Sequence, residues 1–121
     1  MFLPISITAA GLFYARVVDL VGAWQLVEWS ARDDAVGRLI YSGDGFMSAF
    51  LAGGDGSTDA LAYSGTWELR GEEVVHHVSL ATRESFVGRA LVRAVSWVDG
   101  DLVLTTPPTV DDVVNVLRWR R

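Results

Sequence analysis

The chain consists mainly of short runs rich in β-branched and aromatic residues, and most runs are followed by a turn that carries glycine or proline. Runs of this length and composition are typical of β-strands. We predict eight strands, at residues 23–30, 37–42, 46–51, 62–69, 73–80, 87–98, 102–105 and 113–121. One helical turn is expected before them, at residues 16–21. The pattern therefore predicts an all-β protein.

The connections between these strands are short, and this limits how the strands are arranged. Asp44-Gly45 is a strong hairpin signal, because both central positions tolerate a positive φ. Asp99-Gly100-Asp101 forms a turn between two further strands. Pro107-Pro108 ends a strand, since proline cannot donate to a strand ladder. Strands joined in this way form an antiparallel up-and-down meander. Eight of them close most simply into a barrel, and the alternative is an open sandwich of two sheets.

Composition excludes several classes of function. The 121 residues fit one domain, and the hydrophobic fraction of 50% excludes a mainly disordered chain. There is no cysteine, which removes disulfides, thiolate zinc sites and cysteine nucleophiles. All ten basic side chains are arginine, so Schiff-base chemistry through lysine is excluded as well. A net charge of −5 argues against a surface that binds nucleic acid.

The first fifteen residues are uncharged and mostly apolar, and they differ from the rest of the chain. The stretch is shorter than the roughly 20 apolar residues that a membrane helix needs, and it lacks the basic start of a secretory signal. We therefore expect residues 1–16 to be an N-terminal extension and residues 17–121 to form the barrel domain. A cytoplasmic protein is expected, with no membrane contact, no metal and no cofactor.

Two motifs lie at the ends of the predicted barrel. Gly22-Ala23-Trp24 opens the first strand, and it resembles the Gly-x-Trp element of the lipocalin and calycin superfamily. Leu117-Arg118-Trp119-Arg120 lies in the last strand and resembles the closing arginine of that superfamily. Further stretches are similar to the bacterial and fungal lipocalin-like domain family, namely residues 20–29, 37–41, 45–49, 62–67, 74–78 and 100–108. The resemblance covers residues 20–121; it implies a lipocalin-like barrel and suggests an internal pocket.

The Gly-x-Trp element also has a physical role. A tryptophan at the barrel floor buries a large area, and an arginine can stack over its ring and hydrogen-bond to the chain ends. We therefore assign structural roles to Gly22, Trp24 and one arginine. Alternation puts Arg118 and Arg120 on one face, and we favour Arg120 for this contact.

His76 and His77 are the only histidines, and on a strand they point to opposite faces. His76 shares its face with Val74 and Val78, which predicts that it points inward. A single inward histidine without cysteine argues against a zinc site. Two interpretations stay open: a hydrogen-bonded core histidine, or a general acid–base or ligand anchor that faces a cavity.

Two further charged residues are candidates for the interior. Glu28 follows Trp24 on the same face, so it is either a base or ion-pair partner at the barrel mouth or, as we favour, a strand-end glutamate in water. Arg93 shares a face with Arg89, and the apolar content does not decide whether this face is inward. If it is, Arg93 needs a carboxylate partner or an acidic ligand. The family resemblance favours the inward placement.

Aromatic residues in a small barrel usually form its core. If a cavity remains, we expect its walls to include aromatic and sulfur side chains together with His76 and Arg93. The candidate ligand-binding residues are Trp29, Tyr41, Met47, Tyr63, His76, Arg93 and Trp97. The candidate catalytic residues are His76 and Glu28.

Three functions follow from this. The first is a barrel that binds a small apolar or aromatic molecule in its interior. The second is a cyclase or isomerase of a natural-product pathway, a role that some lipocalin-like barrels have. The third is a filled barrel that acts as a protein-interaction module, with a homodimer through an exposed sheet face as one form. Fold alone does not decide among them.

Overall fold

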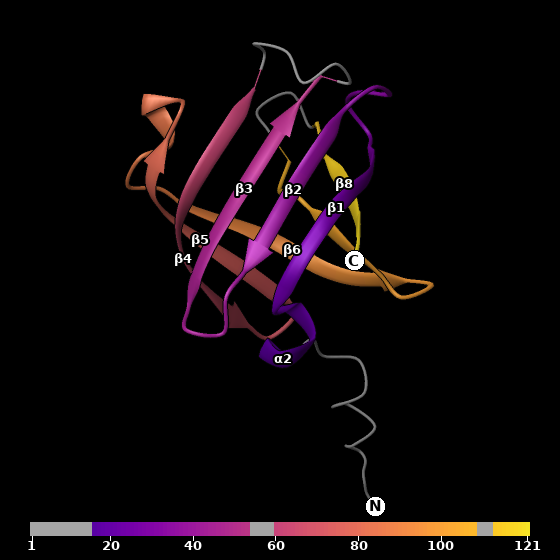
Figure 1. Cartoon of the computed structure of the whole chain (residues 1–121), viewed down its shortest axis with the longest axis horizontal. Coiled ribbons are helices and arrows are strands. Elements are labelled where there is room, and N and C mark those ends of the chain that lie inside the picture. Colours follow the sequence, from indigo (N-terminus) through magenta and orange to yellow (C-terminus); the bar gives the residue numbers. More distant parts are fainter. Residues whose placement is uncertain (1–15, 54–59, 109–112) are drawn as a thin grey trace, which may run out of the picture.

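The computed structural model describes residues 16–53, 60–108 and 113–121. Within these ranges the chain forms eight strands and two helical turns (Figure 1). The strands are β1 (Gly22–Trp29), β2 (Val36–Tyr41), β3 (Phe46–Ala52), β4 (Leu61–Arg70), β5 (Glu73–Ala81), β6 (Ala90–Val98), β7 (Asp101–Thr105) and β8 (Val116–Arg120). The helical turns are α2 (Val17–Leu20) and the 3-10 turn η1 (Glu84–Phe86). Each predicted strand has a counterpart.

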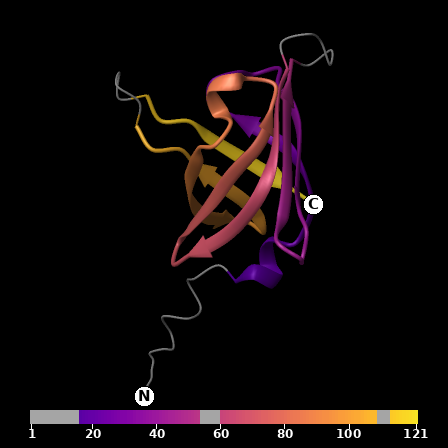
Figure 2. The same cartoon turned by 90° about the vertical axis from the view of Figure 1, so that its left-hand side faces the viewer.

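All eight strands belong to one closed antiparallel barrel. Each strand pairs with its neighbours in sequence, and β8 pairs with β1 to complete the ring. In Figures 1 and 2 the strands β2 and β3 cross β6 on the opposite wall, and α2 lies at one end of the barrel. The predicted up-and-down barrel with a short N-terminal helical turn is confirmed, and the open sandwich is wrong.

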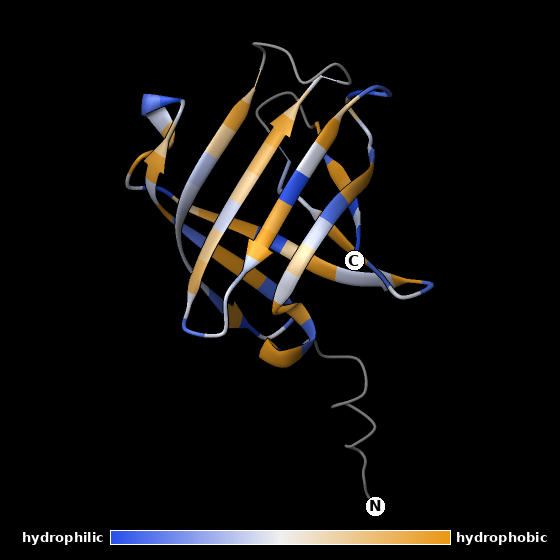
Figure 3. Cartoon of the chain, in the orientation of Figure 1, coloured by the Kyte–Doolittle hydropathy of each residue, from blue (hydrophilic) through white to orange (hydrophobic). Residues whose placement is uncertain are grey.

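One face of each strand points into the barrel and forms the core. In β2, Leu39 and Tyr41 are buried while Arg38 and Ile40 are exposed, and this alternation is what a half-buried strand requires. Figure 3 shows apolar and polar residues mixed along the strands in the same way. The largest fully buried side chains are Trp24, Tyr41, Leu20, Leu39, Leu102, His76, Val74 and Val75.

The two Asp-Gly turns differ in conformation. Asp99 and Gly100 have φ of 51° and 85°, so they form the two-residue hairpin turn that suits the twist of antiparallel strands. In the turn between β2 and β3 only Gly45 has a positive φ, at 97°, and its N–H donates to the Ser42 carbonyl at 3.2 Å. Both central residues therefore have a positive φ only in the turn at Asp99 and Gly100.

A β-bulge in β1 changes which side chains face the interior. The pairing of β1 with β8 shifts between Leu26 and Glu28. Strict alternation from Trp24 would turn Glu28 inward and Trp29 outward. Because the bulge inserts a residue, Trp29 is half-buried and Glu28 is exposed. The interpretation of Glu28 as an inward base or partner of Arg93 is therefore wrong, and its place is in water.

Two strands begin later than predicted. Residues 87–89 precede β6 instead of opening it, because η1 and then Gly88, with a φ of 83°, turn the chain there. The last strand begins at Val116, not at residue 113. The predicted N-terminal extension falls mostly on residues 1–15, which lie outside the described residues. No helix among the described residues is long and apolar enough to cross a membrane.

Trp24 closes one end of the barrel. Its side chain is 1% exposed, and its indole N–H donates to the Leu20 carbonyl of α2 at 2.9 Å. The Arg121 guanidinium lies 4.2 Å from the Trp24 ring centre and donates to the carbonyls of Val21 and Asp19 at 2.9 and 2.5 Å. An arginine thus covers the floor tryptophan and hydrogen-bonds to the backbone just before β1, as the Gly-x-Trp element suggests.

The arginine at the floor is not the expected one. We favoured Arg120, but its guanidinium pairs with the Asp101 carboxylate at 2.8 Å, beside Arg118 at 2.6 Å. These two arginines share one strand face, as alternation predicts, and Asp101 lies on that face. Arg121 follows the last residue of β8, so it is free of the strand alternation and reaches the floor. A Cβ on Gly22 would lie 2.6 Å from the Arg121 guanidinium, which explains why glycine suits this position.

Candidate functional site

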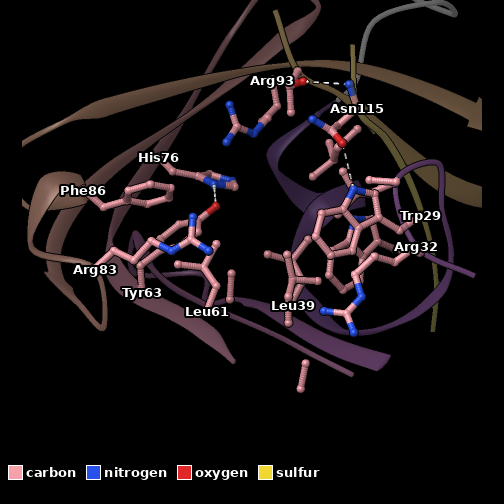
Figure 4. Close-up of a pocket in the computed structure, with 18 residues that line it drawn as sticks. Trp29, Arg32, Leu39, Leu61, Tyr63, His76, Arg83, Phe86, Arg93 and Asn115 are labelled. Carbon is pink, nitrogen blue, oxygen red and sulfur yellow. Dashed lines mark hydrogen bonds between the residues drawn. The ribbon is translucent and has the colours of Figure 1, made fainter. Parts of the chain in front are cut away.

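The barrel encloses a cavity of about 440 Å³ between its two walls. Its apolar lining comes from six of the eight strands, from η1 and from the β1–β2 loop. The large apolar side chains are Trp29, Leu39, Leu51, Leu61, Phe86, Leu104, Leu117 and Trp119. Figure 4 shows Tyr63, His76 and Phe86 on one side and Trp29, Arg32 and Asn115 on the other. None of the residues that form the floor contact, Leu20, Trp24 and Arg121, lines this cavity.

His76 is held between two tyrosines at the cavity wall. Its Nε2 lies 2.6 Å from the Tyr41 hydroxyl, and its Nδ1 lies 2.8 Å from the Tyr63 hydroxyl. The three side chains come from β5, β2 and β4 and are all buried. Both ring nitrogens of His76 are therefore occupied, and Tyr63 and His76 line the cavity while Tyr41 lies behind them.

This cluster is electrically neutral near pH 7. Burial lowers the pKa of His76 from 6.5 to about 3, and the positive charges of Arg93 and His77 act in the same direction. Burial raises the pKa of Tyr41 well above 10. Burial also raises the pKa of Tyr63, although the positive charge of the nearby Arg93 opposes this. The cluster can donate and accept hydrogen bonds, but none of its groups titrates near neutral pH.

The charged side chains of the lining are all basic. Arg32, Arg83 and Arg93 line the cavity, and none of the described lining residues is an aspartate or glutamate. Arg93 comes from the inward face of β6, beside the buried Leu91. It donates to the neighbouring Val92 carbonyl at 3.0 Å, and no ion pair joins it to a carboxylate among the described residues. The open question about Arg93 is thus answered in favour of the inward face.

Asn115, Trp119 and Thr106 also belong to the polar lining. The indole N–H of Trp29 donates to the Asn115 side-chain oxygen at 3.0 Å, across 86 positions of the sequence. The indole N–H of Trp119, a residue 2% exposed, has no hydrogen-bond partner among the described residues. A buried donor without an acceptor is rare in folded proteins, because leaving it unpaired is costly.

The structure brings together four of the seven residues that we expected to bind a ligand. Trp29, Tyr63, His76 and Arg93 all line the cavity. Tyr41 contacts His76 instead, and Met47 is buried in the core. Trp97 is 39% exposed and packs against Trp24 with ring centres 6.1 Å apart, so it lies outside the cavity. Its placement as a wall was wrong because its ring lies at the end of the barrel, against Trp24.

Sequence reasoning missed several lining residues. The alternation of Leu117 and Trp119 opposite the two arginines of β8 was a usable signal that Trp119 points inward. Asn115 gave no such signal, since its role depends on a contact with Trp29 that only the closed barrel creates. Within the described residues, no group of three or more His, Cys, Asp or Glu side chains is placed to hold a metal ion.

Comparison with known proteins identifies the fold but no family. No protein-family model and no curated protein matches the sequence. The crystal structure of an alanine variant of the fluorescent protein UnaG is similar to this chain, with a TM-score of 0.50 and 17% identity. The alignment covers 88% of this chain and 98% of that one. At this identity the likeness shows the fold alone, a closed eight-stranded antiparallel barrel, and the resemblance to the lipocalin-like domain family stays a prediction.

Proposed function

We propose that this barrel binds a small, largely apolar molecule in its internal cavity. The observation that carries the proposal is the cavity itself, which has about 440 Å³ walled mainly by leucine and aromatic side chains with a few polar groups. Cavities of this size and lining are typical of small-molecule sites. A barrel whose side chains filled the interior would favour the interaction-module alternative, and this cavity argues against it.

The protonation of the cluster supports binding over acid–base catalysis. A general acid or base works best when its pKa lies near the working pH. The pKa of His76 is lowered to about 3, and those of both tyrosines are raised above 10. Glu28, the other candidate base, is exposed and does not line the cavity. We therefore favour a binding protein over the cyclase or isomerase alternative.

The proposal is tested by extracting the purified protein with organic solvent and identifying what is released by mass spectrometry. We expect a small apolar molecule in a fixed ratio to the protein. The matched variant is Leu51→Trp, which places a larger side chain in the cavity lining. Its control is Val36→Trp, because Val36 is 44% exposed on the outer face of β2.

Each variant has a definite expected result. Leu51→Trp should fold and lose the molecule, and Val36→Trp should retain it. If a molecule is released equally from both variants, it does not occupy this cavity. If the folded wild-type protein releases nothing, the wild type and both variants are compared for binding of added phenylnaphthylamine, an apolar fluorescent probe. The proposal fails if the wild-type protein does not bind this probe.

A further inference from the structure

The polar groups of the cavity allow one step beyond the proposed function, on which the following argument rests. The proposed function needs only an apolar ligand. The direction of each hydrogen bond around His76, however, limits which polar group that ligand carries.

The first step is the tautomer of His76. A neutral histidine donates through one ring nitrogen and accepts through the other. Tyr41 is 1% exposed, and its hydroxyl has His76 Nε2 as its only hydrogen-bond partner among the described residues. If Nε2 carried the proton, the Tyr41 O–H would be left unpaired in the core. Tyr41 therefore donates to Nε2, and the His76 proton is on Nδ1.

The second step fixes the role of Tyr63. Since Nδ1 carries the proton, the 2.8 Å contact is a donation from His76 to the Tyr63 oxygen. Arg93 lines the same cavity, and its positive charge acts on Tyr63. The hydroxyl hydrogen of Tyr63 is then left without an acceptor among the described residues, on a side chain that lines the cavity. The Tyr63 hydroxyl is therefore placed to donate to a ligand.

The other polar groups have the same character. The Asn115 side-chain oxygen accepts from Trp29, because an indole N–H can only donate. The amide N–H₂ group of Asn115 does not take part in this contact and can donate to another acceptor. Trp119 lines the same cavity, although its unpartnered indole N–H is itself buried and is not counted among the groups that meet a ligand. The Arg93 guanidinium adds a positive charge that no described carboxylate neutralises. The lining thus combines donors with positive charge.

We propose that the ligand is an organic acid, an apolar body with an anionic oxygen group that binds between the Arg93 guanidinium and the Tyr63 hydroxyl. Anionic oxygens accept strong hydrogen bonds from guanidinium and hydroxyl donors. The attraction is local, because the whole chain has a net charge of −5 and repels anions at a distance. A neutral ligand of equal size would leave the charge of Arg93 uncompensated.

A matched pair of fluorescent probes tests this inference. Anilinonaphthalene sulfonate carries an anionic oxygen group, and phenylnaphthylamine has the same aromatic skeleton without it. We expect wild-type protein to bind the anionic probe at least about tenfold more tightly at low salt. Arg93→Met should lower the affinity for the anionic probe about 10- to 100-fold. The affinity for the neutral probe should stay within about twofold of the wild-type value. Tyr63→Phe should lower the affinity for the anionic probe by a smaller factor than Arg93→Met does.

Two controls make the result specific. Arg70→Met removes the same charge from an exposed position on β4, where the Arg70 side chain pairs with Glu68, and should leave both affinities unchanged. Leu51→Trp should abolish binding of both probes, which separates the cavity from the outer surface. Equal affinity of the two probes in wild type, or equal effects of Arg93→Met and Arg70→Met, would overturn the inference but leave the proposed function standing. Binding of neither probe would overturn both.

Discussion

At the scale of single residues, His76 is a titratable group that the fold removes almost entirely from water. Its ring is 1% exposed, and both nitrogens are paired with tyrosines. A histidine with a lowered folded-state pKa stays neutral in the fold while the unfolded chain gains a proton near pH 6.5. The free energy of unfolding therefore falls as the pH decreases from about 6.5 towards 3. The slope is at most about 1.4 kcal/mol per pH unit.

We predict that wild-type protein loses about 2 kcal/mol of stability between pH 7 and pH 5. The measurement is urea unfolding at the two pH values, with His76→Gln as the matched variant, since glutamine keeps hydrogen-bonding groups but does not titrate. This window avoids Asp101, whose pKa is lowered to about 2 by Arg120 and Arg118. His76→Gln should show a clearly smaller loss, and an equal loss in both proteins would show that His76 is not the cause.

Some of these residue roles follow from sequence and others do not. The pattern around His76 places it inward, because alternation with Val74 and Val78 depends only on neighbours in the strand. The identity of its partners is not accessible in this way, since Tyr41 and Tyr63 come from other strands whose registers the chain alone does not define. Arg121 was missed for a related reason: it lies beyond the last strand, where alternation gives no prediction.

At the scale of elements, the two β-bulges decide where sequence patterns fail. Eight strands and their order follow from the turn residues and the period of two. A bulge adds one residue to a strand and reverses the faces beyond it, and no feature of β1 marks the shift between Leu26 and Glu28. Strict alternation from Trp24 predicts that Trp29 points outward, but the bulge turns it inward and Trp29 lines the cavity. The second bulge, between Ser64 and Gly65, has a visible steric cause.

Gly65 is the residue that allows β4 and β5 to approach at this second bulge. A Cβ at Gly65 would lie 1.8 Å from the His77 carbonyl oxygen, which is backbone and cannot rotate away. We predict that Gly65→Ala lowers the free energy of unfolding by about 3 kcal/mol or more. The matched control is Gly43→Ala, where nothing lies within 4 Å and φ is not positive, so the change should stay within about 0.5 kcal/mol. Urea unfolding of the two variants compares them directly, and similar losses would contradict the steric explanation.

At the scale of the whole molecule, the barrel separates the contacts that close it from those that line its cavity. The floor contact joins Trp24, the α2 end and Arg121, and none of these residues lines the cavity. The cavity is lined instead by residues such as Tyr63, His76 and Arg93. Because the two groups share no residue, substitutions in the floor contact should change stability without changing ligand affinity.

A double-mutant cycle with Arg121→Ala and Arg93→Met tests this separation. Arg121→Ala removes the ring contact and two hydrogen bonds to carbonyls, so it should lower the free energy of unfolding by about 1–2 kcal/mol and leave probe affinity unchanged. Arg93→Met should lower the affinity for the anionic probe. It should leave the free energy of unfolding nearly unchanged, since no described carboxylate pairs with Arg93. In the double variant both effects should add within about 0.5 kcal/mol, measured by urea unfolding and probe titration. A larger coupling energy would mean that closing the floor also shapes the cavity, and the barrel would then act as one unit in binding.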